Sequence, residues 1–237
     1  WELYAPTDWT QAHDIAAENP AMLKELQRQF LIEAVRYNVL PLDDRRVERF
    51  NSDLAGRPTL IKGKSQMLFS GMGRLTENVV LNLKNKSCAV TAEVLLPDGN
   101  ANGVIIAQGG EFGGWSFYAK DGRLKYCYNL FGLNRFTTES ASPLPGGKHQ
   151  VRMEFVYAGG GLAKGGSVTL YVDGQPVGHG QIPATQPMVF SADETCDVGR
   201  ETGSTVGDDY TAETSKFNGA ITWIQLDQGA DDHDHLI

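Results

Sequence analysis

The chain has 237 residues, a formal net charge of −8 and a pI near 5.1. A nucleic-acid surface needs clustered Lys and Arg, so this charge argues against a nucleic-acid partner. No apolar run approaches the roughly eighteen residues of a membrane span, and we expect no membrane partner. The length suits one main all-β domain.

The first 45 residues predict a short strand over residues 1–4 and one long helix. Asn19 is a favoured helix N-cap, and Pro20 fits the first helical position, where its missing N–H costs nothing. Asn38 is placed to end the helix in a left-handed conformation. Apolar residues recur at gaps of three and four along one face: Leu23, Leu26, Phe30, Ala34 and Tyr37. We expect either another chain or the rest of this chain to cover that stripe.

Residues 46–63 show neither a helical nor a strand period, and they follow the charged run from Asp43 to Arg46, which we interpret as a solvated face. Gly56, Arg57 and Pro58 add turn-forming residues. We therefore expect an extended linker or strap between the helix and the region that follows.

From residue 64 onward the pattern predicts strands separated by polar turns. Asp121-Gly122 and Asp173-Gly174 are two-residue hairpin signals, because both positions tolerate the positive φ of a type I′ turn. The expected strands cover residues 78–83, 88–96, 103–108, 115–120, 123–129, 135–139, 148–156, 167–173, 175–181, 185–198 and 219–227, with Pro97-Asp98-Gly99 closing the second. The fold class is therefore mainly β, an antiparallel jelly-roll sandwich over residues 64–227, with an acidic flexible tail over 228–237.

The cysteines Cys88, Cys127 and Cys196 are odd in number and lack metal-ligand spacing. We interpret them as buried thiols, because free Cys packs as a small hydrophobic residue. A disulfide between two of them stays open as the alternative.

Two parts of the chain resemble a known family. Trp1-Glu2-Leu3-Tyr4, followed by AHDIAAENPAMLKELQRQFLIEAVRYNVLPLDDR, resembles the carboxy-terminal tail of bacterial arylsulfatases of the alkaline-phosphatase-like superfamily. The segments from ENVVLNLKNKSCAVTAEV to FNGAITWIQL look like the concanavalin A-like and laminin G-like β-sandwich tail of one subgroup.

This resemblance implies a fragment that lacks the large α/β domain, where family members keep the formylglycine, the calcium ion and the sulfate site. It implies no cofactor on this chain. The partner of the helix stripe would be the missing catalytic domain or another copy of the chain. The compartment stays open between a bacterial periplasm and cytoplasm, because the chain begins at Trp1 and we expect its amino terminus to be cut.

No catalytic or metal residue is predicted. Cys196 and Arg200 have the spacing of the sulfatase Cys-x-Pro-x-Arg segment, but Val198 stands where Pro would be, and we expect a strand end followed by a turn. Asp43-Asp44 and Asp208-Asp209 lack the further ligands that a hard cation needs. A glycosidase needs paired carboxylates on one strand face, and the segment with Asp193, Glu194 and Asp197 does not supply them. A calcium site built from Asp193, Asp197, Asp208 or Asp209 has no distinctive spacing, and the tail residues His233 and His235 are the remaining metal candidates.

A carbohydrate site is the strongest rival to a purely structural role. Aromatic rings stack on sugars, and amide or guanidinium groups donate hydrogen bonds to hydroxyls. The candidate contacts lie around one hairpin: Trp115, Tyr126, Tyr128, Asn129 and Arg135. The alternative, which we favour, is that most of these aromatic rings are core.

Two functions are therefore expected. The first is a non-catalytic carboxy-terminal portion of an arylsulfatase-like sulfuric ester hydrolase, with a structural, docking or substrate-access role and no activity alone. The second is a stand-alone carbohydrate-binding module. The expected organisation is a strand and helix over residues 1–45, a linker over 46–63, the sandwich and the tail.

Overall fold

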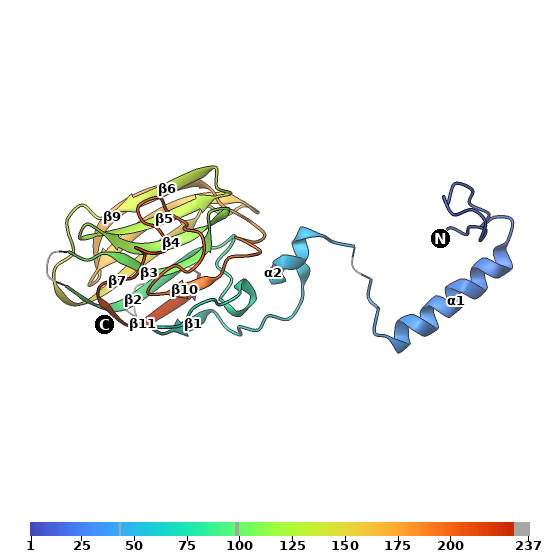
Figure 1. Cartoon of the computed structure of the whole chain (residues 1–237), viewed down its shortest axis with the longest axis horizontal. Helices are drawn as coiled ribbons and strands as arrows, with labels where there is room; N and C mark the ends of the chain where they lie inside the picture. The colour runs from blue at the N-terminus through green and yellow to red at the C-terminus, as the bar shows by residue number, and fades with distance from the viewer. Residues whose placement is uncertain (43, 98–99, 230–237) are drawn as a thin grey trace. The chain divides into compact units, whose positions relative to one another are not determined.

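The computed structural model describes residues 1–42, 44–97 and 100–229 (Figure 1). The chain forms two compact units, Trp1–Arg46 and Val47–Ile237. The turn expected at Pro97-Asp98-Gly99 and the tail residues His233 and His235 lie outside the described residues, in whole or in part. No helix among the described residues is long and apolar enough to cross a membrane.

The first unit contains the predicted helix. Helix α1 (Pro20–Arg36) begins with Pro at its first position, and Asn38 has the expected left-handed φ of 55°. The strand predicted over residues 1–4 is wrong. Leu3 donates its backbone N–H to the Asp14 carboxylate, and its carbonyl oxygen accepts from Ile15, so side-chain and single backbone contacts replace a sheet ladder.

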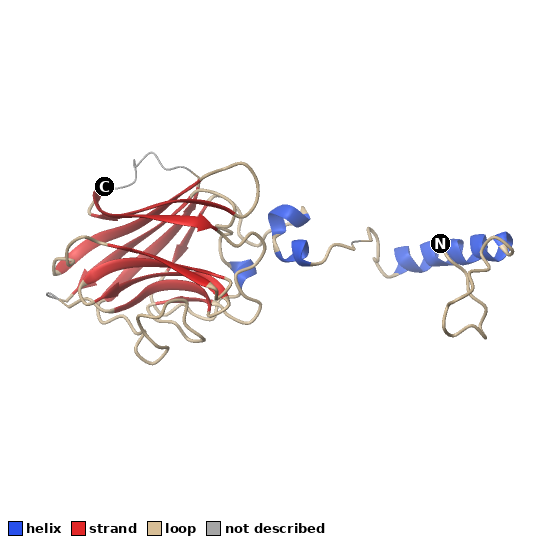
Figure 2. Ribbon diagram, turned by 90° about the horizontal axis from the view of Figure 1, so that it is seen from above, coloured by secondary structure: helices blue, strands red, loops and turns tan. Residues whose placement is uncertain are grey.

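Two antiparallel sheets form the second unit, which confirms the predicted sandwich (Figure 2). The six-stranded sheet has the order β1-β11-β2-β7-β8-β9, and the five-stranded sheet has the order β10-β3-β4-β5-β6. The strands are β1 (Ser65–Leu68), β2 (Cys88–Leu96), β3 (Gly103–Gly110), β4 (Gly113–Lys120), β5 (Arg123–Leu130), β6 (Asn134–Glu139), β7 (Gly147–Tyr157), β8 (Lys164–Val172), β9 (Gln175–Ala184), β10 (Cys196–Val198) and β11 (Ala220–Gln228).

Both predicted Asp-Gly hairpins are present. Asp121 and Gly122 have φ values of 50° and 79°, and Asp173 and Gly174 have 48° and 76°. Positive φ at both central residues is what a type I′ turn requires, and its twist matches that of the flanking strands. The turns therefore fix the register of β4 against β5 and of β8 against β9.

The core lies between the two sheets. Val90, Phe117, Met153 and Ile224 belong to it, each at most 1 % exposed. All three cysteines are free and buried, as predicted. A second, smaller cluster lies on the outer face of the five-stranded sheet, beneath the loop of residues 201–216: Val104, Ala107, Tyr118, Cys127, Val206 and Tyr210.

Two predicted strands are wrong in whole or in part. Residues 78–83 form no strand, because residues 78 and 79 belong to the short 3-10 helix η2 (Glu77–Val79) and residues 80–83 continue it as a loop. The side chain of Gln66 accepts from Leu81 N at 2.7 Å and donates to Val79 O at 2.9 Å, which satisfies backbone groups that a ladder would otherwise pair. Of residues 185–198, β10 alone is a strand.

The segment predicted to be a linker folds with the sandwich. We call residues 47–63 the strap. It contains a 3-10 helix, η1 (Val47–Phe50), and a short helix, α2 (Ser52–Ala55), and it lies within the second compact unit.

Candidate functional site

The three aromatic side chains predicted to face a sugar lie in the core. Trp115, Tyr126 and Tyr128 are 2 %, 3 % and 5 % exposed. The Trp115 and Tyr126 rings stack with centroids 6.3 Å apart, and the Tyr128 hydroxyl accepts a hydrogen bond from Gln186 N. These three rings therefore present no platform to a ligand. They are core residues, which is the alternative favoured from the sequence.

The two predicted polar contacts hold loops in place. Asn129 is fully buried and donates from Nδ2 to the carbonyl oxygens of Gly110 and Glu111. Arg135 donates from Nε to Val206 O at 2.8 Å and pairs with Asp208 at 3.3 Å. Both side chains therefore use their hydrogen-bonding groups to hold turns and loops of the sandwich.

Cys196 does not fit the role of a sulfatase nucleophile. It lies within β10, is fully buried, and its burial raises the pKa of the thiol, so that it stays protonated. Asp197 accepts from the backbone N–H groups of Arg74 and Thr202, which pins two loops. Among the described residues, no group of three or more His, Cys, Asp and Glu side chains is placed to hold a metal ion.

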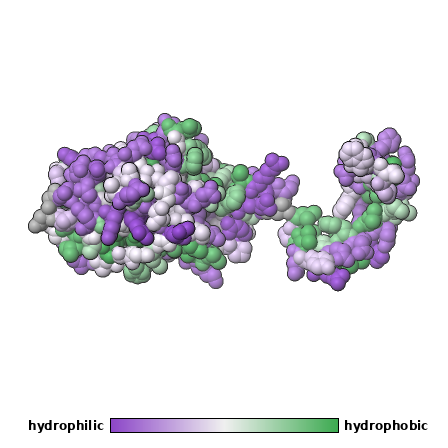
Figure 3. All heavy atoms as spheres, in the orientation of Figure 1, coloured by the Kyte–Doolittle hydropathy of each residue, from purple (hydrophilic) through white to green (hydrophobic). Residues whose placement is uncertain are grey.

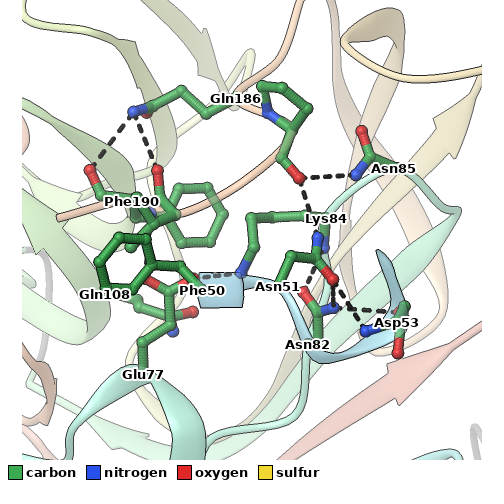
Figure 4. Close-up of polar contacts among 12 residues, drawn as sticks. Phe50, Asn51, Asp53, Glu77, Asn82, Lys84, Asn85, Gln108, Gln186 and Phe190 are labelled. Carbon is green, nitrogen blue, oxygen red and sulfur yellow. Dashed lines mark hydrogen bonds and ion pairs between the residues drawn. The ribbon is translucent and has the colours of Figure 1, made fainter. Parts of the chain in front are cut away.

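The strap is fixed to one end of the sandwich by a buried amide. Asn51 is 2 % exposed, donates from Nδ2 to Pro187 O at 2.9 Å, and caps α2 by accepting from Asp53 N at 3.0 Å. Asn82 donates to both Asn51 Oδ1 and the Asp53 carboxylate. Figure 4 shows these groups meeting around Asn51, which places the neighbouring Phe50 at a defined position on the sandwich.

A buried ion pair lies beneath the strap. Lys84 pairs with Glu77, and its ammonium nitrogen lies 4.7 Å from the centroid of the Phe190 ring (Figure 4). Glu77 also accepts from Phe190 N at 3.0 Å. Burial lowers the pKa of Lys84, while the Glu77 charge favours its protonated form. The pair ties the segment around η2 to the loop before β10.

Two hollows adjoin at this end of the sandwich. The inner hollow, of about 150 Å³, lies between the strap and the segment from Glu77 to Lys84, and Gln228 also lines it. The outer hollow has a volume of about 310 Å³. Its lining consists of Phe50, Arg57, Thr76, Glu77, Asn78, Val189, Ser191, Ala192, Asp193, Glu194 and Thr195. The residues common to both hollows are Phe50, Arg57, Glu77 and Asn78.

Phe50 gives this site an aromatic wall. The side chain is 59 % exposed although the backbone beside it is fixed by Asn51. The guanidinium of Arg57 donates from Nε to Arg49 O at 3.2 Å, which holds it against the end of η1. An exposed ring, an arginine and several amide, hydroxyl and carboxylate groups therefore surround one small concavity, the usual make-up of a small-molecule site.

A third hollow, also of about 310 Å³, lies beside β10 and β11 and contains Asp197, Arg200, Lys216 and Phe217. Phe217 is 5 % exposed, so this hollow has no aromatic face turned to solvent. The space-filling view shows apolar patches within a largely hydrophilic exterior on one face of the sandwich (Figure 3). We take the outer hollow as the candidate site because it is the larger of the two hollows that the exposed Phe50 ring lines.

The sequence pattern does not predict this site, because the strap has no hydrophobic period. One signal was available. Asn51 is a favoured N-cap residue, and Gly56, which adopts a left-handed φ of 67°, stands where a short helix ends. That pair brackets α2 and would have identified the strap as a folded element.

No protein-family model and no curated protein matches the chain. Solved structures of similar fold include mouse laminin alpha1 domains LG4-5, with 15 % identity over 70 % of this chain and a TM-score of 0.44. A Ruminococcus gnavus IT-sialidase CBM40 bound to alpha2,6 sialyllactose has 12 % identity over 76 % of this chain, 97 % of that chain, and a TM-score of 0.43. A Streptococcus pneumoniae NanB sialidase mutant has 14 % identity over 73 % of this chain and a TM-score of 0.48.

This chain spans 40 % of the laminin chain and 27 % of the NanB chain in those structures. At these identities the likeness concerns the fold alone. The two antiparallel sheets and their strand order define an antiparallel jelly-roll sandwich. The comparisons give no support to the resemblance to arylsulfatases.

Proposed function

We propose that the sandwich is a non-catalytic glycan-binding module that holds a neutral sugar ring in the outer hollow. The observation that supports this most is the exposed ring of Phe50 on the wall of a concavity lined by polar groups. The apolar C–H face of a pyranose packs on an aromatic ring, while its hydroxyls need donors and acceptors at the edge. Arg57, Asn78 and Asp193 supply both kinds of group.

The charge of the hollow favours a neutral sugar. Arg57 and three carboxylates line it, those of Glu77, Asp193 and Glu194. Lys84 offsets the charge of Glu77, which leaves Arg57 against the two carboxylates of Asp193 and Glu194. A sulfate group in this space would therefore face a net negative wall, which is unfavourable in a partly desolvated site. Sugar hydroxyls, in contrast, donate well to carboxylates.

The test is a titration of the chain with neutral and sulfated oligosaccharides, followed by calorimetry. We expect saturable binding of a neutral sugar and at least tenfold weaker binding of its sulfated form. Phe50→Ala should lower the affinity about tenfold, or about 1.4 kcal/mol. Phe69→Ala is the matched control, because Phe69 is 51 % exposed and lies outside the hollow. Absence of saturable binding, or equal affinities for the wild type and Phe50→Ala, would contradict the proposal.

A second candidate places this module at the carboxy-terminal end of a larger arylsulfatase-like enzyme. The observation that favours it is the exposure of apolar side chains on the helix of the first compact unit. Leu3 and Ala34 are buried there, but Leu26 is 50 % and Val35 71 % exposed on α1. Such a helix needs a partner surface. On this proposal the partner is a catalytic domain with formylglycine and calcium, or another copy of the chain.

The coding sequence upstream of Trp1 tests the second candidate. We expect a Cys-x-Pro-x-Arg or Ser-x-Pro-x-Arg segment in the same reading frame. An upstream frame without this segment would exclude the sulfatase parent and leave the glycan-binding proposal unaffected.

A further inference from the structure

A second aromatic surface lies on two neighbouring turns of the sandwich. The turn between β3 and β4 carries Phe112, and the turn between β5 and β6 carries Phe131 and Leu133. These side chains are 72 %, 51 % and 80 % exposed. We call these three residues the hairpin tips.

The two turns are held together as one body. Asn129 Nδ2 donates to Gly110 O and Glu111 O in the first turn, and Asn129 Oδ1 accepts from Gly132 N in the second. A Cβ on Gly132 would lie 2.7 Å from Glu111 O, so glycine permits the close approach of the two backbones. The rings on the tips are therefore presented by a rigid base.

Phe131 adopts a left-handed backbone conformation, with φ at 57°. Glycine or asparagine takes this conformation with less strain than a bulky aromatic residue does. An aromatic ring therefore occupies an exposed turn position where it lowers stability. Such an observation points to a use for the ring outside the fold.

The hairpin tips are linked to the outer hollow by residues that contact one another. Glu194 lines that hollow, and a Cβ on Gly110 would lie 2.7 Å from Glu194 Cγ. Ser204 links the same parts, because its hydroxyl donates to Glu194 at 2.7 Å and accepts from Glu111 N at 2.9 Å. A surface of directly contacting residues thus leads from the wall of the hollow to Phe112.

We propose that the hairpin tips bind further sugar residues of an oligosaccharide whose first residue occupies the outer hollow. This inference rests on the proposed function. A hollow of about 310 Å³ is at the small end of ligand sites and suits one or two rings, so a longer glycan must leave it. Phe112 and Phe131 offer flat faces for the next rings, and Glu111 and Asn134 offer hydrogen-bonding groups beside them.

The test uses cello-, malto- and xylo-oligosaccharides of one to six residues, titrated into the full chain. The variant is Phe112→Ala with Phe131→Asn, both at exposed positions, and Asn suits the left-handed φ. Phe69→Ala is again the control. We expect wild-type affinity to rise with length. The double variant should bind the mono- and disaccharide as the wild type does and lose at least tenfold in affinity for the hexasaccharide.

Three outcomes would overturn the inference. Affinity that does not depend on length would remove it, and so would an unchanged hexasaccharide affinity in the double variant. If the wild type bound phosphatidylcholine vesicles, the double variant did not, and hexasaccharide affinity stayed equal, the tips would be assigned to a lipid surface. A failure of the glycan-binding proposal itself is distinguishable, because the wild type would then bind no sugar of any length.

Discussion

The side-chain amide of Asn51 donates a hydrogen bond of 2.9 Å to the carbonyl oxygen of Pro187, which lies 136 positions further along the chain. The bond joins the strap to the loop before β10, and Asn51 is 2 % exposed. It therefore determines where Phe50 stands relative to the sandwich.

Replacing Asn51 with Ala should loosen the strap without unfolding the sandwich. The change removes the bond to Pro187 and the cap of α2, and each loss costs about 1 kcal/mol. We expect faster amide hydrogen exchange over residues 47–63 and weaker glycan binding. Asn218→Ala is the control, because Asn218 also bridges distant segments, at Asn100 and Asn102. Unchanged exchange in the strap would show that Asn51 does not hold it.

Breaking the buried ion pair should destabilise the sandwich strongly. Lys84→Met leaves the Glu77 carboxylate, whose side chain is only 18 % exposed, without its cation, and the loss of one partner of such a pair costs up to about 3 kcal/mol. Glu77→Gln added to Lys84→Met removes the uncompensated charge, so the double variant should regain part of the lost stability. Urea unfolding of the wild type, Lys84→Met, Glu77→Gln and the double variant measures the coupling. Strictly additive losses would show that the two side chains do not act as a pair.

The pH dependence of stability should depend on Glu201. Burial raises the pKa of this carboxyl from 4.5 to about 7. The folded protein therefore holds the proton more tightly than the unfolded chain does. Protonation of Glu201 therefore stabilises the folded protein. This contribution to the free energy of unfolding is complete below pH 4.5 and is lost as the pH rises through 7, by about 3 kcal/mol.

Glu201→Gln should remove that dependence, because the amide oxygen can still accept from Val206 N, as the carboxylate does at 2.9 Å. We expect the stability difference between the variant and the wild type to grow in favour of the variant between pH 5 and pH 8. Glu213→Gln, at an exposed position in the same loop, should leave the profile between pH 5 and pH 8 unchanged, because hydrogen bonds lower the pKa of this carboxyl and it is ionised throughout the range. A constant difference for Glu201→Gln across this range would be inconsistent with a raised pKa.

Most strands and helix α1 were predictable because turn residues and the spacing of apolar residues, both local features of the sequence, specify them. Asp121-Gly122 takes the expected positive φ values, and the spacing after Pro20 gives α1. Residues 78–83 were mistaken for a strand, because a Val- and Leu-rich run has the same composition whether a neighbouring strand or the Gln66 side chain pairs its backbone.

The aromatic platform could have been rejected from the sequence. A two-residue turn at Asp121-Gly122 sets Lys120 opposite Arg123, which places Phe117 opposite Tyr126 and Trp115 opposite Tyr128, as the structure has them. Opposed residues share a sheet face, so all four rings belong to the core once Trp115 and Phe117 do. The outer hollow was not predictable in this way, because it depends on long-range contacts such as that of Asn51 with Pro187.

The most direct test of the central claim is an NMR titration of the isotope-labelled chain with a neutral oligosaccharide, because it locates the binding site. We expect the largest amide shifts around Phe50, Arg57, Asn78 and Asp193. Shifts centred instead on the outer face of the six-stranded sheet, where Arg152 of β7 lies opposite Thr91 of β2, would contradict it.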